Sequence, residues 1–149
     1  MKKKQIVIAM IIVMVCVIPI FSYFHVAGRR IDNIKNVSDA CTVMIIKYQH
    51  MEYDKRSEYV LDAGQIDQLK ELIIESSFTR DLSNMIMFHD HDIYDIQIDF
   101  NNHRDFISIH CIGNEYISVT NQFNDKFLKV NNRNWKATLE KIIQSTDAN

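Results

Sequence analysis

The stretch YDIQIDFNNHRDFISIHCIGNEYISV, residues 94–119, decides the fold that this sequence predicts. From Tyr94 to Phe100 apolar and polar residues alternate, which is the two-residue period of a strand with one buried face and one solvated face. The same alternation returns twice, after breaks at 101–104 and 113–114 that are rich in the Asn and Gly of tight turns. The stretch therefore predicts three consecutive strands of an antiparallel meander.

Further elements are predicted on both sides of the meander. A strand at 40–51 is apolar on both faces and is expected to be covered on both, and residues 52–57 are expected to form a charged turn. Asp62 is placed to cap a helix over 65–76, whose apolar residues recur with the 3.6-residue period. The remaining elements are a short strand at 58–62, a short helix or irregular crossover within 78–91, a strand at 127–130 and a helix at 135–144. The order β-β-α-β-β-β-β-α predicts an α+β domain, in which helices cover one face of an antiparallel sheet and the other face is largely solvated.

An uncharged segment near the N-terminus is long enough to cross a membrane. No Asp, Glu, Lys or Arg occurs in the 23 residues from Gln5 to Ala27. A helix of that length spans roughly 34 Å, against a hydrocarbon core of about 30 Å. A cleaved signal peptide is the rival interpretation, but His25-Val26-Ala27 has His where a cleavage site needs a small residue. The sequence therefore predicts an uncleaved signal anchor at residues 6–26.

Four regions follow from this anchor. Residues 1–5 are expected to form a cytoplasmic basic tail, 6–26 the transmembrane helix, 27–38 a juxtamembrane connector and 39–149 an extracytoplasmic α+β domain. The connector is expected to continue the membrane helix for a turn or two. The three lysines of the tail slightly outweigh the basic residues just beyond the helix, so the N-terminus is expected in the cytoplasm. The expected location is the cell membrane, which the chain crosses once.

The part of the chain beyond the anchor is acidic. Of the 17 basic residues three lie in the tail, which leaves 14 bases against 19 acids and a formal charge of −5. Such a balance lacks the basic footprint that neutralises phosphates, so nucleic acid is not an expected partner.

The sequence His89-Asp90-His91-Asp92 offers candidate metal ligands. In an extended segment His89 and His91 share one face, and two imidazoles can begin a Zn²⁺, Cu²⁺ or Ni²⁺ site. A closed site needs three or four ligands, and the further candidates are His50, His103 and His110. The alternative interpretation, which we favour, is a polar loop that leads into the next strand.

Two cysteines fall in predicted strands, Cys41 and Cys111. Outside the membrane they can form a disulfide if their side chains meet across the sheet. The alternative, which we favour, is a pair of buried free thiols that behave as small apolar residues.

No sequence pattern marks a catalytic centre. The chain contains no G-x-S-x-G, Walker A, G-x-G-x-x-G, H-E-x-x-H or C-x-x-C pattern, and its three glycines are too few for a phosphate-binding loop. Asp95 and Asp99 lie two pleats apart, roughly 13 Å along a strand, which is too far for the usual acid and base of a glycosidase. His110 adjoins Cys111 and therefore points to the opposite face of its strand. The protein is expected to be no enzyme and to bind no cofactor.

The architecture resembles a group of known proteins. A basic N-terminus, one anchor helix and a small domain with a strand at 59–61, the sequence Asp62-Ala63-Gly64-Gln65-Ile66 and a following helix are similar to the small membrane-anchored proteins of undetermined function (domain-of-unknown-function proteins) common in Gram-positive bacteria. The resemblance covers most of the chain and implies no site residues. We expect a non-catalytic, membrane-anchored module that binds a protein, peptide or envelope component. The alternative function is a metal-binding or metal-sensing domain that uses His89 and His91.

Overall fold

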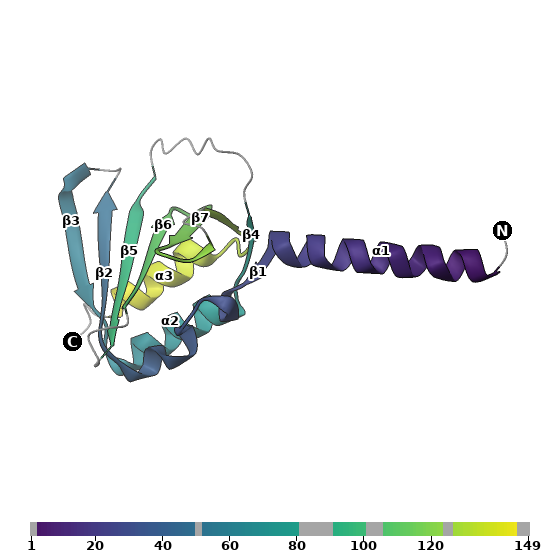
Figure 1. Ribbon diagram of the computed structural model, residues 1–149. Coiled ribbons are helices and arrows are strands. Elements are labelled where there is room, and N and C mark those ends of the chain that lie inside the picture. The colour runs from purple at the N-terminus through teal and green to yellow at the C-terminus, as the bar shows by residue number, and fades with distance from the viewer. Residues whose placement is uncertain (1–2, 50–51, 81–90, 101–105, 124–126, 146–149) are drawn as a thin grey trace.

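The structure is a computed structural model that describes residues 3–49, 52–80, 91–100, 106–123 and 127–145. A long helix, α1 (Lys3–Phe24), projects away from a domain in which helices pack on a sheet (Figure 1). The domain's helical elements are α2 (Ala63–Glu75), α3 (Trp135–Gln144) and two short 3₁₀ helices, η1 (Gly28–Arg30) and η2 (Ile34–Asp39). Its strands are β1 (His25–Ala27), β2 (Ala40–Gln49), β3 (Glu52–Val60), β4 (Ser77–Arg80), β5 (Ile93–Phe100), β6 (Phe106–Ile112), β7 (Tyr116–Val119) and β8 (Leu128–Val130). The predicted α+β class, with an apolar helix ahead of an antiparallel sheet, is confirmed.

The strands form one antiparallel sheet in the order β1-β4-β8-β7-β6-β5-β2-β3. The predicted meander lies in its middle as β5, β6 and β7, where Tyr94 lies opposite Cys111 and Cys111 opposite Ile117. Because successive side chains of a strand point to opposite faces, this register places the alternating apolar residues of all three strands, such as Tyr94, Cys111 and Ile117, on one face. Helices α2 and α3 cover that face (Figure 1).

The core fills the space between the sheet and the helices. Phe78 of β4 and Trp135 of α3 are fully buried there, and their rings meet edge to face with 5.9 Å between centroids. Leu69 of α2 and Leu139 of α3 are buried in the same cluster. On the opposite face the predicted polar alternates are exposed or half-buried: Asp95, Gln97, Asp99, Ser108, Ser118 and Thr120.

Both long helices of the domain agree with their predicted positions. Helix α2 begins two residues before the predicted start, and Asp62 caps it as expected: its carboxylate accepts from the Gln65 backbone N–H at 2.9 Å. The Gln65 side chain completes a capping box by accepting from the Asp62 backbone N–H at 2.9 Å. Helix α3 spans the predicted residues 135–144.

Two expectations about the first hairpin are wrong. Residues 52–57 are not a turn but the first part of β3, where Arg56 lies opposite Tyr48. Charge misled the sequence interpretation because β3 is an edge strand, and edge strands carry charged side chains that face water. Strand β2 is also not covered on both faces, since Thr42 is exposed and Met44 only half-buried.

The junction between the helix and the domain also differs from the expected connector. The helix does not continue past residue 24; instead β1 follows it directly and pairs with β4, with Val26 opposite Phe78. Val26 is buried, and the Gly28 N–H donates to the Ser76 carbonyl at 2.8 Å. Strand β4 occupies the start of the segment expected to be a helix or crossover, and residues 81–90 lie outside the described part of the chain. The junction is therefore part of the sheet and not a linker.

Candidate functional site

The candidate site lies at the end of helix α1, where the helix meets the domain. The helix segment Gln5–Phe24 is long and apolar enough to span a membrane, and none of that segment is buried against the domain. The end of this helix at Phe24 therefore marks the level at which the domain begins.

Two guanidinium groups from the domain hold the last turn of α1. Arg30 donates from Nη1 to the Ser22 carbonyl at 3.3 Å, and so satisfies one of the carbonyls that a helix end leaves without a partner. The Arg80 guanidinium lies 4.4 Å from the centroid of the Tyr23 ring and 5.8 Å from that of Phe123. The Nε of Arg80 is buried and has no hydrogen-bond partner among the described residues.

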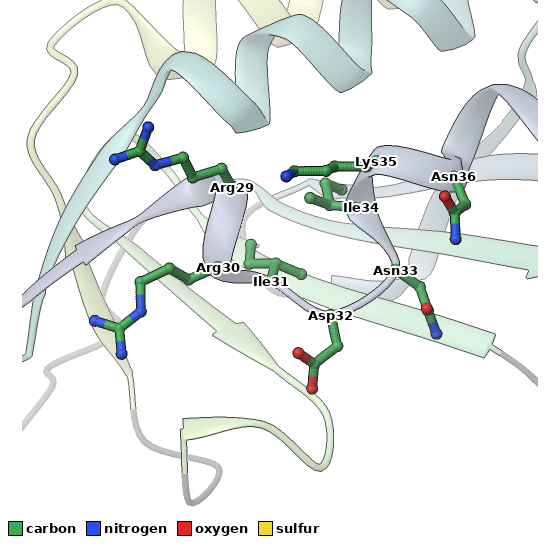
Figure 2. Close-up of a pocket in the computed structure, with 8 residues that line it drawn as sticks. All are labelled: Arg29, Arg30, Ile31, Asp32, Asn33, Ile34, Lys35 and Asn36. Atoms are coloured by element: carbon green, nitrogen blue, oxygen red, sulfur yellow. The ribbon is translucent and has the colours of Figure 1, made fainter.

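A polar hollow adjoins these contacts. It has a volume of about 550 Å³ and is formed by residues 29–36, which run from η1 into η2 (Figure 2). Ile31 and Ile34 are buried and fix this segment to the core, so the residues between and beside them face outward. Figure 2 shows Arg29 and Arg30 extending in different directions from one turn of η1. We call Arg29, Arg30, Lys35 and Arg80 the basic collar.

Two of the collar cations carry charge that no described carboxylate balances. Neither Arg29 nor Lys35 forms an ion pair with any residue that the structure describes, and the hollow contains a single acid, Asp32. By contrast, Lys55 lies 2.6 Å from Glu52 on β3. The collar is thus a local positive surface on a domain whose formal charge is negative.

A second polar cluster lies where α3 meets the ends of β2 and β5. Lys47 Nζ is 3.2 Å from Glu140 and 3.5 Å from Asp92, and Lys136 Nζ is 3.1 Å from Asp92. The Tyr94 hydroxyl donates to Glu140 at 2.7 Å. This cluster has two bases and two acids and fastens α3 to the sheet.

The pKa values of the cluster follow from these bonds. Partial burial by itself would raise the pKa of Glu140, but the Tyr94 hydroxyl and the Lys47 ammonium together bring it below its usual range. Burial would lower the pKa of Lys47, and its bonds to Glu140 and Asp92 raise it instead. Burial is the main cause that raises the pKa of Tyr94, which therefore stays a hydrogen-bond donor at neutral pH. The adjacent hollow, about 130 Å³, is smaller than the sites that usually hold organic ligands.

A third feature lies on the open face of the sheet. His110 of β6 and Asp95 of β5 are opposite each other, and Nδ1 of the histidine contacts Oδ1 of the aspartate. Their side chains are 40% and 23% exposed, which makes the pair a partly solvated contact on an open surface. As predicted, Cys111 points to the other face and is buried. The alternation alone did not reveal the pair, because the pair depends on the register in which β5 and β6 align.

The predicted metal ligands are only partly described. His89, His50 and His103 lie outside the described residues. The ring of His91 packs against Gly113, where an added Cβ would be 3.3 Å from the ring Nδ1. Across the described ranges no group of three or more His, Cys, Asp and Glu side chains could hold a metal ion.

The two cysteines are not brought together. Cys111 carries a free thiol; burial is the main cause that raises its pKa to about 12, and a weak interaction with the Trp135 indole N–H opposes that shift. Cys41 lies in β2 beside the end of β5 at Asp99 and Phe100, whereas Cys111 lies opposite Tyr94. Five residues along a strand correspond to roughly 16 Å, and a disulfide needs Cα atoms less than about 7 Å apart.

Comparison with models of known protein families, with curated proteins and with solved structures finds no match. The functional conclusion therefore rests on the geometry of the anchor helix, its junction and the surfaces around them.

Proposed function

We propose that this protein is a single-pass membrane protein whose domain is a non-catalytic binding module, held in a fixed orientation on the extracytoplasmic surface. Its partner is a protein, a peptide or another component of the cell envelope. The observation that supports this proposal is the junction, where the chain passes from α1 into the sheet without a linker.

The junction argues against removal of the helix as a signal peptide. A cut after Ala27 would remove all of β1, although Val26 is 1% exposed and pairs with β4. Full burial of a valine side chain contributes about 1.5 kcal/mol or more, so β1, which follows the helix directly, belongs to the folded domain. The three lysines ahead of the helix favour a cytoplasmic N-terminus.

The open face of the sheet supplies the binding surface in this proposal. The helices leave this face uncovered along its polar rows, and two large apolar side chains are exposed at its margins: Val60 is 60% and Phe106 58% exposed. Met44 lies beside Val60, and Asp99 beside Phe106. A mixed surface of polar residues with a few large apolar anchors is typical of protein interfaces.

The anchor is tested by charge. Replacement of Val13 and Val17 by Arg should cost about 2.5 to 3.5 kcal/mol each near the helix centre and should move the full-length protein out of the membrane fraction. The matched control replaces the same residues by Leu and should stay in the membrane. A cysteine introduced near residue 145 should react with a thiol reagent that cannot cross the membrane and is added outside the cell. Recovery of native protein in the soluble fraction with a new N-terminus near Gly28 would contradict the proposal.

The binding surface is tested by crosslinking in cells. A photoreactive amino acid at Gln97, on the open face, should give a discrete crosslinked product on irradiation. The same residue at Gln68, exposed on α2 on the helical side, serves as the control and should not give that product. Identical products from the two positions, or none from Gln97 and Ser108, would argue against a partner on this face.

A further inference from the structure

We propose that the basic collar, Arg29, Arg30, Lys35 and Arg80, binds the phosphate of anionic phospholipid headgroups in the leaflet from which the domain emerges. The proposal rests on the membrane anchoring proposed above. It adds a ligand class and a site to a protein whose partner is otherwise undefined.

Two residues of the collar, Arg30 and Arg80, contact the last turn of α1. Arg30 reaches the carbonyl of Ser22, and Arg80 stacks on Tyr23, so both cations lie at the last turn of α1. If α1 spans the membrane, this turn is where the hydrocarbon ends, and aromatic rings such as that of Tyr23 favour this interface. The phosphates of the lipid therefore lie within reach of both guanidinium groups.

The shape of the hollow fits a headgroup. Its volume of about 550 Å³ lies in the range of sites that hold small molecules. Arg29 and Lys35 extend beside it, and no described carboxylate pairs with either of them (Figure 2). Arginine binds phosphate through parallel N–H donors, and lysine adds a compact charge, so this set of donors suits a phosphate diester.

The charge of the collar is positive, whereas the net charge of the whole domain is negative. The chain beyond residue 27 carries a formal charge of −5, so a uniformly charged domain would be repelled by an anionic membrane. Three of the four collar cations lie within residues 29–35, against one acid, Asp32. Basic residues close to an anionic surface favour binding individually, and their effect falls off within a Debye length. The collar thus gives the helix-proximal side of an acidic domain a local positive charge, which favours an anionic bilayer surface.

The experiment measures lipid binding to the full-length protein. Native mass spectrometry of the detergent-solubilised chain, titrated with phosphatidylglycerol or phosphatidylcholine, gives the affinity for each lipid. The test variant carries Arg29→Gln, Arg30→Gln and Lys35→Gln. The control carries Lys55→Gln, Arg56→Gln and Lys141→Gln, which removes the same charge from β3 and from the end of α3, at the end of the domain opposite α1 (Figure 1).

The wild type should bind phosphatidylglycerol at least about 10-fold more tightly than phosphatidylcholine, the test variant should lose that preference, and the control should keep it within about twofold. Equal affinity of the wild type for the two lipids would overturn the proposal without reference to any variant. Equal losses in the test and control variants would also overturn it, because the effect would then be one of net charge. Displacement of phosphatidylglycerol by millimolar inorganic phosphate would identify a free-anion site and overturn the lipid assignment.

Failure of the anchor is distinguishable from failure of the collar. A protein that is not a membrane protein is released from membranes by alkaline carbonate, whereas an anchored protein without lipid preference stays in the pellet. The second result would overturn the lipid site and leave the anchoring intact.

Discussion

Gly28 is the residue at which the chain leaves β1 and passes directly against the backbone of α2. An added Cβ would lie 1.6 Å from the backbone oxygen of Ile73, which cannot move without distorting the helix. We expect Gly28→Ala to destabilise the protein by about 3 kcal/mol or more, since overpacking against backbone is among the costly core changes. The control is Gly64→Ala, where the nearest atom is Asp62 Oδ1 at 3.4 Å.

Gly64 lies in the first turn of α2, and alanine there should be neutral or stabilising by up to about 1 kcal/mol. Chemical denaturation of the two variants compares them directly. Equal midpoints would show that the approach of the chain at Gly28 is looser than the structure indicates.

Tyr94 is the residue that links the sheet to α3 through Glu140. Tyr94→Phe removes a hydrogen bond to a carboxylate and should cost about 1 to 2 kcal/mol at pH 7, near the lower end for charged partners because Glu140 is about one third exposed. In the folded protein the pKa of Glu140 is below its unfolded value, so its stabilising effect is complete above about pH 4.3 and is lost as the pH falls through the folded pKa.

The variant raises that pKa toward its usual value. The difference in unfolding free energy between wild type and variant should therefore shrink as the pH is lowered from 7 to 3. Tyr59→Phe is the control, because Tyr59 lines the same hollow and its hydroxyl bonds to no residue in the described ranges. A difference that is constant with pH would mean that Tyr94 acts through packing alone.

At the scale of elements, Gln65 joins α2 to α3. This side chain is 3% exposed, and its amide nitrogen donates to the Ile142 carbonyl at 2.7 Å and the Ser145 hydroxyl at 2.8 Å. Gln65→Leu should destabilise the domain by about 2 to 4 kcal/mol, because it removes both hydrogen bonds and leaves the buried Ile142 carbonyl without this donor. Gln68→Leu on the exposed side of the same helix should stay within about 0.5 kcal/mol. Similar thermal midpoints for the two variants would contradict the role of Gln65 as the link.

The elements that sequence could predict are those with a long and regular pattern. Strands β5 to β7 alternate over several residues, and α2 and α3 repeat with the helical period, so local patterns were enough for them. Strands β1 and β4 have three and four residues, and they pair across about 50 residues of chain, so no local pattern marks either. The basic collar was missed for the same reason, since Arg80 reaches Tyr23 only when β4 lies beside β1.

At the scale of the whole molecule, the stability of the domain depends on β1, the three residues that directly follow the helix. We expect a chain of residues 25–149 to be more stable than one of residues 28–149 by about 2 to 3 kcal/mol, chiefly because the second lacks the buried Val26. Urea unfolding of the two proteins measures the difference. A shorter chain of equal stability would show that β1 is dispensable, and would reopen the possibility of cleavage after Ala27.

The absence of a linker also limits how far the protein can reach. A compact domain of about 120 residues has a radius of gyration of about 14 Å, and so extends roughly 35 to 40 Å beyond the end of α1. In the membrane arrangement proposed above, a partner further than this from the bilayer lies beyond the reach of the described domain and must approach the bilayer to be bound. In that arrangement, copies that diffuse in one membrane would present the same sheet edge at the same distance from the bilayer, so they would meet in two dimensions with similar orientations. In this respect the domain is held at a fixed distance and orientation, and is not free to move on a flexible linker.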